Sequence, residues 1–461
     1  MIFTSFKLEN FRGISQPVEI DFTKGNQDFP FVLVGNNESG KTTILKGINF
    51  ISVLCRGKQL PENFFVSIRP KSSYFNGDII LSACLSCNND DMSALKSLKT
   101  PSKKLICKDI TNSEDGKFEL SFIYPFKNSA CDEGIICINK KQIDKDDSIM
   151  GWIAERTPEI VYYDDFMFEV PDKIRFSRRE NGAQDLLSSS EKNYQWQMIL
   201  NDFLIGSYYI HACVKDEKAV LDVDFQRDII DCNDVDAIDQ RMASINDYLN
   251  SIVKEDWENI TKGKSVFDSC VIERSNSSDG NFVDFCLKVK AKNRSFSLYE
   301  RSKGFRWFFC FKVFTEVRRH RSKNGVVFLL DEPANNLHIR LQENILDFLK
   351  NLSRLEGNKV IYSTHSPYLI NQNEQDNLFS VRNEASDFEL PRVMCNRFLE
   401  LDTSTKEAQN AVEPIIQKVK IYVMQKISFS SVMKMLRNIH SCTEIINKIT
   451  ENIKKIIESP D

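Results

Sequence analysis

Apolar and polar positions mark two strand–turn–helix segments that lie far apart in the sequence. The first has the apolar run Phe31–Val34, a glycine-containing turn, and a helix with apolar residues at Ile44, Ile48 and Ile51. The second has the apolar run Val326–Leu330, which ends at two acidic residues and precedes another helical pattern. Uninterrupted apolar strands of this kind are typical of buried strands in an α/β sheet. We therefore predict an α/β fold with a mixed sheet and flanking helices.

The chain between these two segments has a different pattern, which predicts an inserted lobe over residues 61–290. Apolar runs at Ile79–Cys84 and Phe118–Tyr124 predict short strands between polar loops. Between residues 238 and 252, apolar positions recur at alternating steps of four and three, which predicts a helix. This spacing lasts for only about two heptads, so we expect a short helical arm rather than a long coiled coil.

The turn after Phe31–Val34 carries the most specific motif of the chain, a glycine at each end followed by lysine and threonine. Glycines in such a turn let backbone N–H groups surround phosphate oxygens, and the following helix N-terminus adds partial positive charge. The lysine neutralises phosphate, and the threonine hydroxyl ligates Mg²⁺. The motif Gly35-x4-Gly40-Lys41-Thr42 thus predicts a nucleotide site that includes Asn36, Asn37, Glu38, Ser39, Gly40, Lys41, Thr42 and Thr43.

The second apolar strand supplies the acidic half of such a site. It delivers Asp331 to the second coordination shell of Mg²⁺, while Glu332 can polarise the attacking water as a general base. An apolar strand that ends in two acidic residues is weak evidence alone. Together with the phosphate loop, it predicts nucleotide hydrolysis.

The segments GNNESGKTT, FLLDEPANNLH and YSTHSPYLI, in this order, resemble the ATPase head of ABC-type ATPases of the SMC/RecF/OLD group. The opening LENFRGI resembles the N-terminal strand of that group. The segments IVYYDDF and ERSKGF resemble its AAA15/OLD-like branch, which occurs in prokaryotic anti-phage systems. The resemblance implies an ABC-type ATPase head that binds ATP and Mg²⁺ and hydrolyses ATP slowly, as a regulatory step.

Further site residues follow from this resemblance. Arg12 is expected near the nucleotide, and His365 is expected to sense the γ-phosphate. The signature residues Ser302, Lys303 and Gly304 are expected to contact ATP bound by a second subunit, and Asn336 is expected to reach across the same dimer. Lys303 and Phe305 depart from the usual signature, and a serine that caps a helix also accounts for Ser297 or Ser302, but the two other motifs favour the signature interpretation.

The motifs predict how the chain is divided. Residues 1–60 and 291–400 are expected to form the two parts of the ATPase head, separated by the lobe at 61–290. Residues 401–461 show amphipathic helical spacing and are expected to form a helical tail that contacts another subunit or a partner.

Composition and charge narrow the choice of partners. With 61 Lys and Arg against 65 Asp and Glu, the net charge of −4 argues against a chain that binds nucleic acid or membranes through its overall charge. No apolar stretch approaches the roughly 18 residues of a membrane span. No secretory signal is visible, and the 13 cysteines are scattered, which together predict a cytoplasmic protein with reduced thiols.

Three interpretations fit these observations, of which the third is a nucleotide-dependent scaffold that hydrolyses ATP very slowly. In the first, ATP-sandwiched heads form a homo-oligomer that restrains or releases an effector in anti-phage defence, with a phage product as the expected trigger. We expect that effector to be a Toprim-type nuclease supplied in trans, because no Asp-x-Asp motif follows His365. In the second, the chain is a RecF/SMC-like ATPase that clamps DNA during repair, and the basic run Arg318–Lys323 leaves DNA contact open.

Overall fold

A computed structural model gives the fold of the chain. The structure describes residues 1–398, with gaps at 15, 58–59, 61–62, 72–73, 101–102, 105–115, 132, 146–147, 164–169, 179–190, 212–222, 262–266, 279, 322–323, 334–336, 338, 372–373 and 386–389. The predicted helical tail at 401–461 lies outside the described residues. The described chain forms two compact units, the first from residues 1–164, 324–335 and 346–398, and the second from 165–323 and 336–345.

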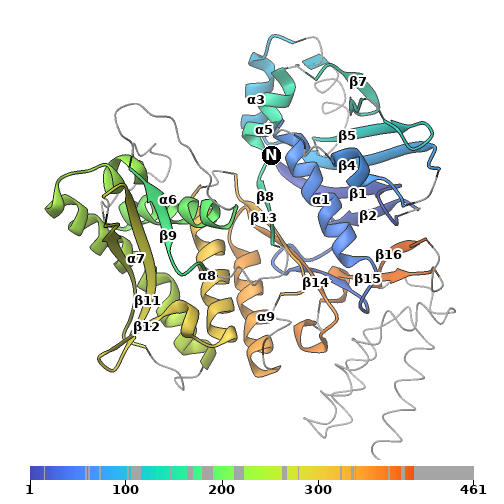
Figure 1. Cartoon of the computed structure of the whole chain (residues 1–461). Helices are drawn as coiled ribbons and strands as arrows, with labels where there is room; N and C mark the ends of the chain where they lie inside the picture. Colours follow the sequence, from blue (N-terminus) through green and yellow to red (C-terminus); the bar gives the residue numbers. More distant parts are fainter. Residues whose placement is uncertain are drawn as a thin grey trace, which may run out of the picture. The chain divides into compact units, whose positions relative to one another are not determined.

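The first unit contains an antiparallel sheet and a mixed sheet (Figure 1). The antiparallel sheet has the order β2-β1-β4-β5-β6-β7, formed by β1 (Ile2–Glu9), β2 (Val18–Asp21), β4 (Gly77–Ser86), β5 (Lys117–Phe126), β6 (Ile135–Ile138) and β7 (Lys141–Ile143). The mixed sheet has the order β16-β15-β3-β14-β13-β8, formed by β3 (Phe31–Val34), β8 (Glu159–Tyr163), β13 (Val326–Leu330), β14 (Lys359–Thr364), β15 (Leu378–Asn383) and β16 (Val393–Arg397). All strands of the mixed sheet are parallel except β16.

Helix α1 (Lys41–Cys55) lies between the two sheets of this unit (Figure 1). Its apolar residues recur at helical spacing, and Ile44, Leu45, Ile48 and Ile51 are fully buried. They join one apolar core with residues of both sheets, which fixes the N-terminus of α1 directly after β3. The other helices described in this part are α2 (Phe64–Ile68), α3 (Asn89–Ser97), α5 (Ser148–Arg156) and the second half of α9 (Ile339–Arg354), since only residues 346–354 of α9 belong to this unit.

The second unit combines a small antiparallel sheet with three packed helices. The sheet has β9 (Ile174–Ser177), β10 (Ser269–Asn276), β11 (Phe282–Ala291) and β12 (Arg294–Ser297), and the helices are α6 (Glu191–His211), α7 (Val235–Thr261) and α8 (Lys303–Arg321). Helix α7 packs against α6, α8 and β10. The helix predicted from the four-three spacing is therefore confirmed, and its apolar seam is buried within this unit.

The α/β class, the mixed sheet and the interruption of the phosphate-loop unit by an inserted segment are as predicted, but the boundaries differ. The lobe was predicted to begin at residue 61 but begins only after Asp164. The segment in between belongs to the first unit because its strand β4 pairs with β1 along Ile2–Glu9 and covers the open edge of that strand. Residues 291–323, predicted as part of the head, belong to the second unit, because β12 pairs with β11 and α8 packs on α6 and α7. Among the described helices, none has the length and apolar character to cross a lipid bilayer.

The turns that precede β13 and β14 touch at two glycines, which gives a test of the first unit. Gly325 has φ of 86°, and a Cβ there would stand 2.0 Å from the carbonyl oxygen of Gly357. Gly57 has φ of 59° but nothing within 4 Å of its Cβ position. We expect Gly57→Ala to cost about 1 kcal/mol for the left-handed backbone alone. Gly325→Ala should cost about 3 kcal/mol or more, because the backbone must also move. Equal shifts of the thermal unfolding midpoint in the two variants would contradict this packing.

Candidate active site

The phosphate loop joins β3 to α1 at the carboxyl end of the parallel strands. Asn36, Asn37 and Glu38 are exposed at its tip, while Ser39 is buried beneath them. Gly40 has φ of 103°, a backbone conformation that favours glycine, and it immediately precedes the first residue of α1. The loop therefore turns sharply into the helix, as the glycine spacing predicts.

The N-terminus of α1 has the features of an anion site. No side chain caps it, and its first turn, which includes Thr42 and Thr43, carries no acidic residue. The first backbone N–H groups of a helix lack partners within the helix and attract negative charge. The buried Ser39 hydroxyl also has no hydrogen-bond partner in the structure. These groups fit a nucleotide phosphate, and the hydroxyl of Thr42 in the first helical turn fits a ligand of Mg²⁺.

The Lys41 ammonium is held inside the loop and is only 5% exposed. It donates hydrogen bonds to the carbonyl oxygens of Gly35 at 2.8 Å and Asn36 at 2.9 Å. Its Nζ also lies 3.1 Å from Oε1 of Glu332. Three partners match the three protons of an ammonium group, so a bound phosphate would compete with the Glu332 carboxylate for the same cation.

Glu332 follows β13 and brings the second sequence motif to the phosphate loop. Its φ of 47° lies in the left-handed region, which is unusual for a residue other than glycine. The other carboxylate oxygen, Oε2, lies 2.9 Å from Nδ1 of His365 and accepts a hydrogen bond from the His365 backbone N–H at 3.3 Å. The structure therefore brings together Lys41, Glu332 and His365, three residues that the sequence assigns to one site.

The two ionisable partners of Glu332 determine its charge state. Burial alone would raise the pKa of the Glu332 carboxyl, but the His365 hydrogen bond and the charge of Lys41 hold this pKa below its usual value. The same hydrogen bond raises the pKa of His365, against the opposing effects of burial and of Lys41. Glu332 is therefore ionised at neutral pH, as a residue that accepts a proton from water must be.

Asp331 is held by two hydroxyl groups to which sequence reasoning assigned no role. Ser363 Oγ donates to Oδ1 of Asp331 at 2.6 Å, and the Tyr162 hydroxyl donates to Oδ2 at 3.3 Å. Both residues stand in segments that resemble the family, YSTHSPYLI and IVYYDDF. Their place in these segments was the available signal, whereas the strand pairing that sets them beside Asp331 comes from the fold.

Arg12 has contacts of a different kind. Its Nε donates to the carbonyl oxygen of Ser67 at 2.8 Å, near the C-terminus of α2. Its guanidinium lies over the rings of Phe11 and Phe50, with centroid distances of 5.1 and 5.9 Å. Burial lowers the pKa of Arg12, whereas the nearby Tyr162 raises it. These contacts connect the turn after β1 to α1 and α2, and a role for Arg12 beside the nucleotide stays a prediction.

The signature residues lie at the N-terminus of α8 in the second unit. Ser302 precedes this helix, and its Oγ accepts a hydrogen bond from the Phe305 backbone N–H at 3.3 Å. Lys303 is the first helical residue, and a Cβ at Gly304 would stand 3.3 Å from the Leu337 side chain. The capping interpretation is thus confirmed for Ser302, and phosphate contact across a dimer stays a prediction.

The predicted contact residue Asn336 lies outside the described residues, as do the side chains of Arg318–Lys323.

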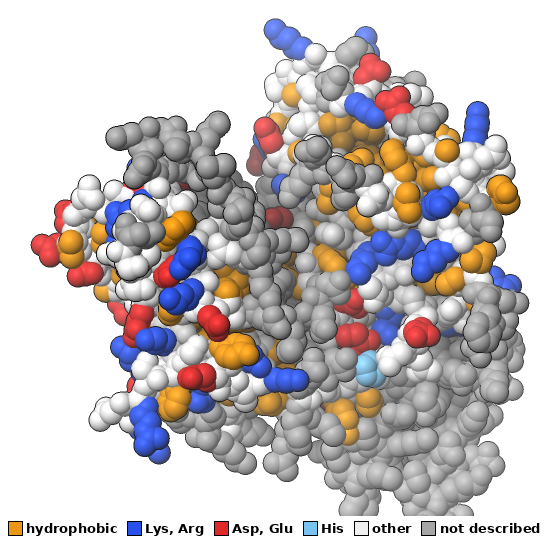
Figure 2. Space-filling model, viewed as in Figure 1, with side chains coloured by type: hydrophobic (Ala, Val, Ile, Leu, Met, Phe, Trp, Pro, Cys, Tyr) orange, Lys and Arg blue, Asp and Glu red, His pale blue; other side chains and the backbone are white. Residues whose placement is uncertain are grey.

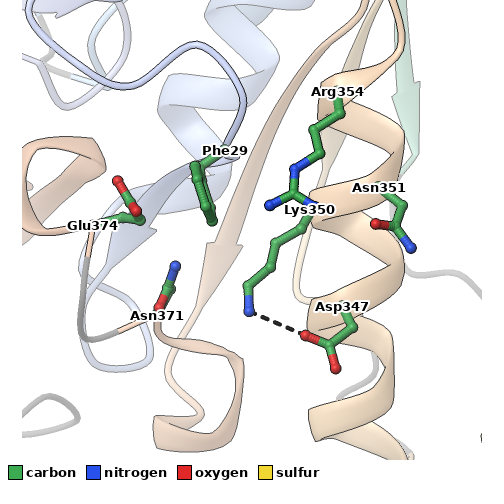
Figure 3. A pocket seen from close by; sticks show the side chains of 7 residues that line it. All are labelled: Phe29, Asp347, Lys350, Asn351, Arg354, Asn371 and Glu374. Atoms are coloured by element: carbon green, nitrogen blue, oxygen red, sulfur yellow. Dashed lines mark hydrogen bonds and ion pairs between the residues drawn. The ribbon is translucent and has the colours of Figure 1, made fainter.

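A pocket of about 350 Å³ lies elsewhere in the first unit (Figure 3). It is lined by Phe29, Asp347, Lys350, Asn351, Arg354, Asn371 and Glu374. Phe29 precedes β3 and Glu374 precedes β15, which places the pocket at the amino edge of the parallel strands, opposite the phosphate loop. Lys350 pairs with Asp347 at 3.1 Å, and the Arg354 guanidinium lies 5.3 Å from the centre of the Phe29 ring. Its cations therefore already have partners, and the pocket is separate from the candidate active site.

The phosphate loop, the acidic end of β13 and the histidine after β14 together define a P-loop nucleotide hydrolase. The chain belongs to the AAA ATPase domain family, whose model matches residues 1–370. This match confirms the prediction that the chain contains an ATPase domain.

Other comparisons give more distant similarities. An uncharacterized protein of Methanocaldococcus jannaschii is 34% identical over 84 residues, which are 18% of this chain and 21% of that protein. The match thus spans about a fifth of that relative's length. Among solved structures, a head domain of Smc bound to the C-winged helix domain of ScpA is 13% identical, with 86% of this chain and 98% of that chain covered and a TM-score of 0.48. A second structure is the Smc head domain with an extended coiled coil bound to the C-terminal domain of ScpA derived from Pyrococcus furiosus. It is 13% identical, the alignment covers 86% of this chain and 96% of that chain, and the TM-score is 0.46. The SMC head domain from Thermotoga maritima is 12% identical, with 86% and 98% covered and a TM-score of 0.40.

The pair of His365 and Glu332 predicts a pH-dependent contribution to stability. The folded-state pKa of His365 is raised above its unfolded value, so the pair stabilises the protein fully below pH 6.5 and loses this effect as pH rises through the folded pKa. We expect His365→Gln to lower the thermal midpoint of the nucleotide-free protein more at pH 6 than at pH 8.5. In a Glu332→Gln background the same substitution should show no such pH dependence. A pH-independent effect in both backgrounds would rule out the ion pair.

Proposed function

We propose that this protein is an ATP-dependent switch that hydrolyses ATP to ADP and phosphate slowly, as a regulatory step. The observation that carries the proposal is the position of the Glu332 carboxylate, with one oxygen at the Lys41 ammonium and the other at His365. A general base and a phosphate-binding cation within 3.1 Å of each other form the core of a phosphoryl-transfer site.

Each residue has a distinct role in this reaction. Lys41 and the N-terminus of α1 bind the phosphates, and Thr42 and Asp331 would hold Mg²⁺. When bound, Mg²⁺ neutralises the negative charge of the phosphate oxygens. Glu332 orients the attacking water and accepts its proton, while His365 fixes the orientation of the Glu332 carboxylate.

The family resemblance supports an assembly in which two copies share each ATP. Ser302, Lys303 and Gly304 of one copy would then contact the phosphate held by Lys41 of the other. ATP binding closes the heads in this assembly, and hydrolysis lets them rearrange. Binding energy that depends on the nucleotide state can in this way restrain or release a partner protein.

The finer proposal places this switch in anti-phage defence. In size and architecture, the chain resembles the ATPase subunit of the two-gene PARIS defence system, in which the ATPase scaffolds and restrains a separate Toprim effector. We propose an effector of that class as the partner and a phage product as the trigger. The neighbouring open reading frame tests this role: a Toprim-type nuclease supports it, whereas a replication or repair operon supports a DNA clamp.

Substitution of the phosphate-binding lysine and of the general base separates binding from hydrolysis. We expect Lys41→Ala to lose ATP binding, because no other side chain at the loop supplies the cation to the phosphates in this assignment. Glu332→Gln should keep ATP binding and slow single-turnover hydrolysis by about 100-fold or more, because the amide accepts no proton from water. Size-exclusion chromatography with light scattering should show an ATP-dependent oligomer that persists in Glu332→Gln.

Two outcomes would contradict this assignment. Hydrolysis by Lys41→Ala at the wild-type rate would place the active site elsewhere. Equal single-turnover rates for the wild-type protein and Glu332→Gln would indicate a nucleotide-dependent scaffold rather than a cycling enzyme.

The second candidate function, a DNA clamp, makes a different prediction about salt. Lys and Arg side chains lie among Asp and Glu side chains on the face shown in Figure 2, in keeping with the overall charge of −4. A clamp that neutralises several phosphates would show DNA affinity that increases with ATP and falls steeply with salt. For the effector-restraining switch we expect weak DNA affinity that ATP does not change. Fluorescence anisotropy with duplex DNA at 50 and 200 mM salt, with Lys41→Ala as the control, distinguishes the two.

A further inference from the structure

The Asp331 carboxylate is bound by one hydroxyl group from each strand that neighbours β13. In the mixed sheet β13 lies between β14 and β8, and both pairs are parallel. Ser363 of β14 donates to Oδ1 at 2.6 Å, and Tyr162 of β8 donates to Oδ2 at 3.3 Å. Each oxygen of the carboxylate therefore has its own donor, which limits rotation of the group.

The strand register explains why Ser363 meets Asp331. Leu330, the last residue of β13, pairs with Tyr362 on one side and Tyr163 on the other. Ser363 is therefore level with Asp331 at the end of the sheet. The Asp331 backbone N–H donates to the carbonyl oxygen of Tyr163 at 3.0 Å, which anchors Asp331 to β8 as well.

Ser363 has a second contact, with the backbone of the general base. Its Oγ accepts a hydrogen bond from the Glu332 N–H at 2.8 Å, and Ser363 is fully buried. A hydroxyl group can donate one hydrogen bond and accept others, so a single atom holds both acidic residues. Because Glu332 has φ of 47°, this bond also helps to retain a backbone conformation that costs free energy.

We propose that Ser363 and Tyr162 are positioning residues, which orient Asp331 toward Mg²⁺ and fix the backbone of Glu332. This inference rests on the proposed function, because it assigns a purpose to the orientation of Asp331. Hydrogen-bond partners of metal-binding carboxylates generally set the direction of the metal-facing oxygen, and their loss costs about 10- to 100-fold in metal affinity or activity. The Ser363 bond is the shorter of the two, so we assign it the larger effect.

A purely structural role for the same hydroxyls would give different results. In that case their removal would lower stability without changing the affinity of the folded protein for the metal. Metal affinity is therefore the measurement that separates the two roles. The chain offers a matched control in Ser380, which is 1% exposed on β15 of the same sheet and whose Oγ has no hydrogen-bond partner in the structure.

The experiment compares the wild-type protein with Ser363→Ala, Tyr162→Phe and Ser380→Ala. Binding of Mn²⁺ in the presence of ADP is followed by electron paramagnetic resonance, and binding of a fluorescent ADP analogue is measured in EDTA. We expect Ser363→Ala to weaken Mn²⁺ binding about 10-fold and Tyr162→Phe several-fold. Ser380→Ala should bind Mn²⁺ as the wild type does. All variants should keep the metal-free nucleotide affinity, because the phosphate loop is unchanged.

Several outcomes would overturn the inference. Wild-type Mn²⁺ affinity in folded Ser363→Ala and Tyr162→Phe would leave only a structural role, and an equal loss in Ser380→Ala would show a nonspecific effect of the sheet. If Ser363→Ala does not fold, Tyr162→Phe decides alone, since it removes one oxygen atom and keeps the ring. A wild-type protein that binds no nucleotide would instead refute the proposed function itself, which distinguishes the two failures.

Discussion

The arrangement of the candidate active site depends on the Glu332 carboxylate, which bridges two elements that are distant in sequence. One oxygen meets the Lys41 ammonium at the start of α1, and the other meets His365 after β14. This bridge places a negative charge where the phosphate loop is built to receive one. A nucleotide phosphate that takes over Lys41 therefore removes one partner of Glu332 and leaves the His365 contact to hold it. In the proposed reaction, exchange of anions at the Lys41 ammonium would thus couple phosphate binding to the state of the Glu332 carboxylate.

The parallel sheet brings the groups that take part in this exchange close together. Because β3, β14, β13 and β8 run in the same direction, the chain turns that follow them all lie at one edge of the sheet. The phosphate loop follows β3, the acidic pair follows β13, and His365 follows β14. Short hydrogen bonds between neighbouring turns then suffice to connect all these groups. The buried Ser363 hydroxyl makes two of these connections, since it binds the Asp331 side chain and the Glu332 backbone N–H at once.

The sequence predicted the strands and turns of this site well, because each carries a strong local signal. A continuous apolar run, a glycine-rich turn and a periodic helix can each be read without knowledge of the fold. The hydroxyl partners of Asp331 were missed, because their role depends on which strands are neighbours and in what register. The boundary at residue 61 failed for the same reason, since pairing of β4 with β1 joins segments about 75 residues apart. Charge and spacing alone contain no information about such pairing.

The structure also changes how the two interpretations of Ser302 relate to each other. As an N-cap, its Oγ accepts a hydrogen bond from the Phe305 N–H, which uses a lone pair and leaves the hydroxyl proton available. As a signature residue, it would donate that proton to a phosphate oxygen of a second copy. The two roles use different parts of one hydroxyl, so the cap orients the group that the dimer would need. A residue type that both caps a helix and binds phosphate is therefore well suited to this position, and capping is no argument against phosphate contact.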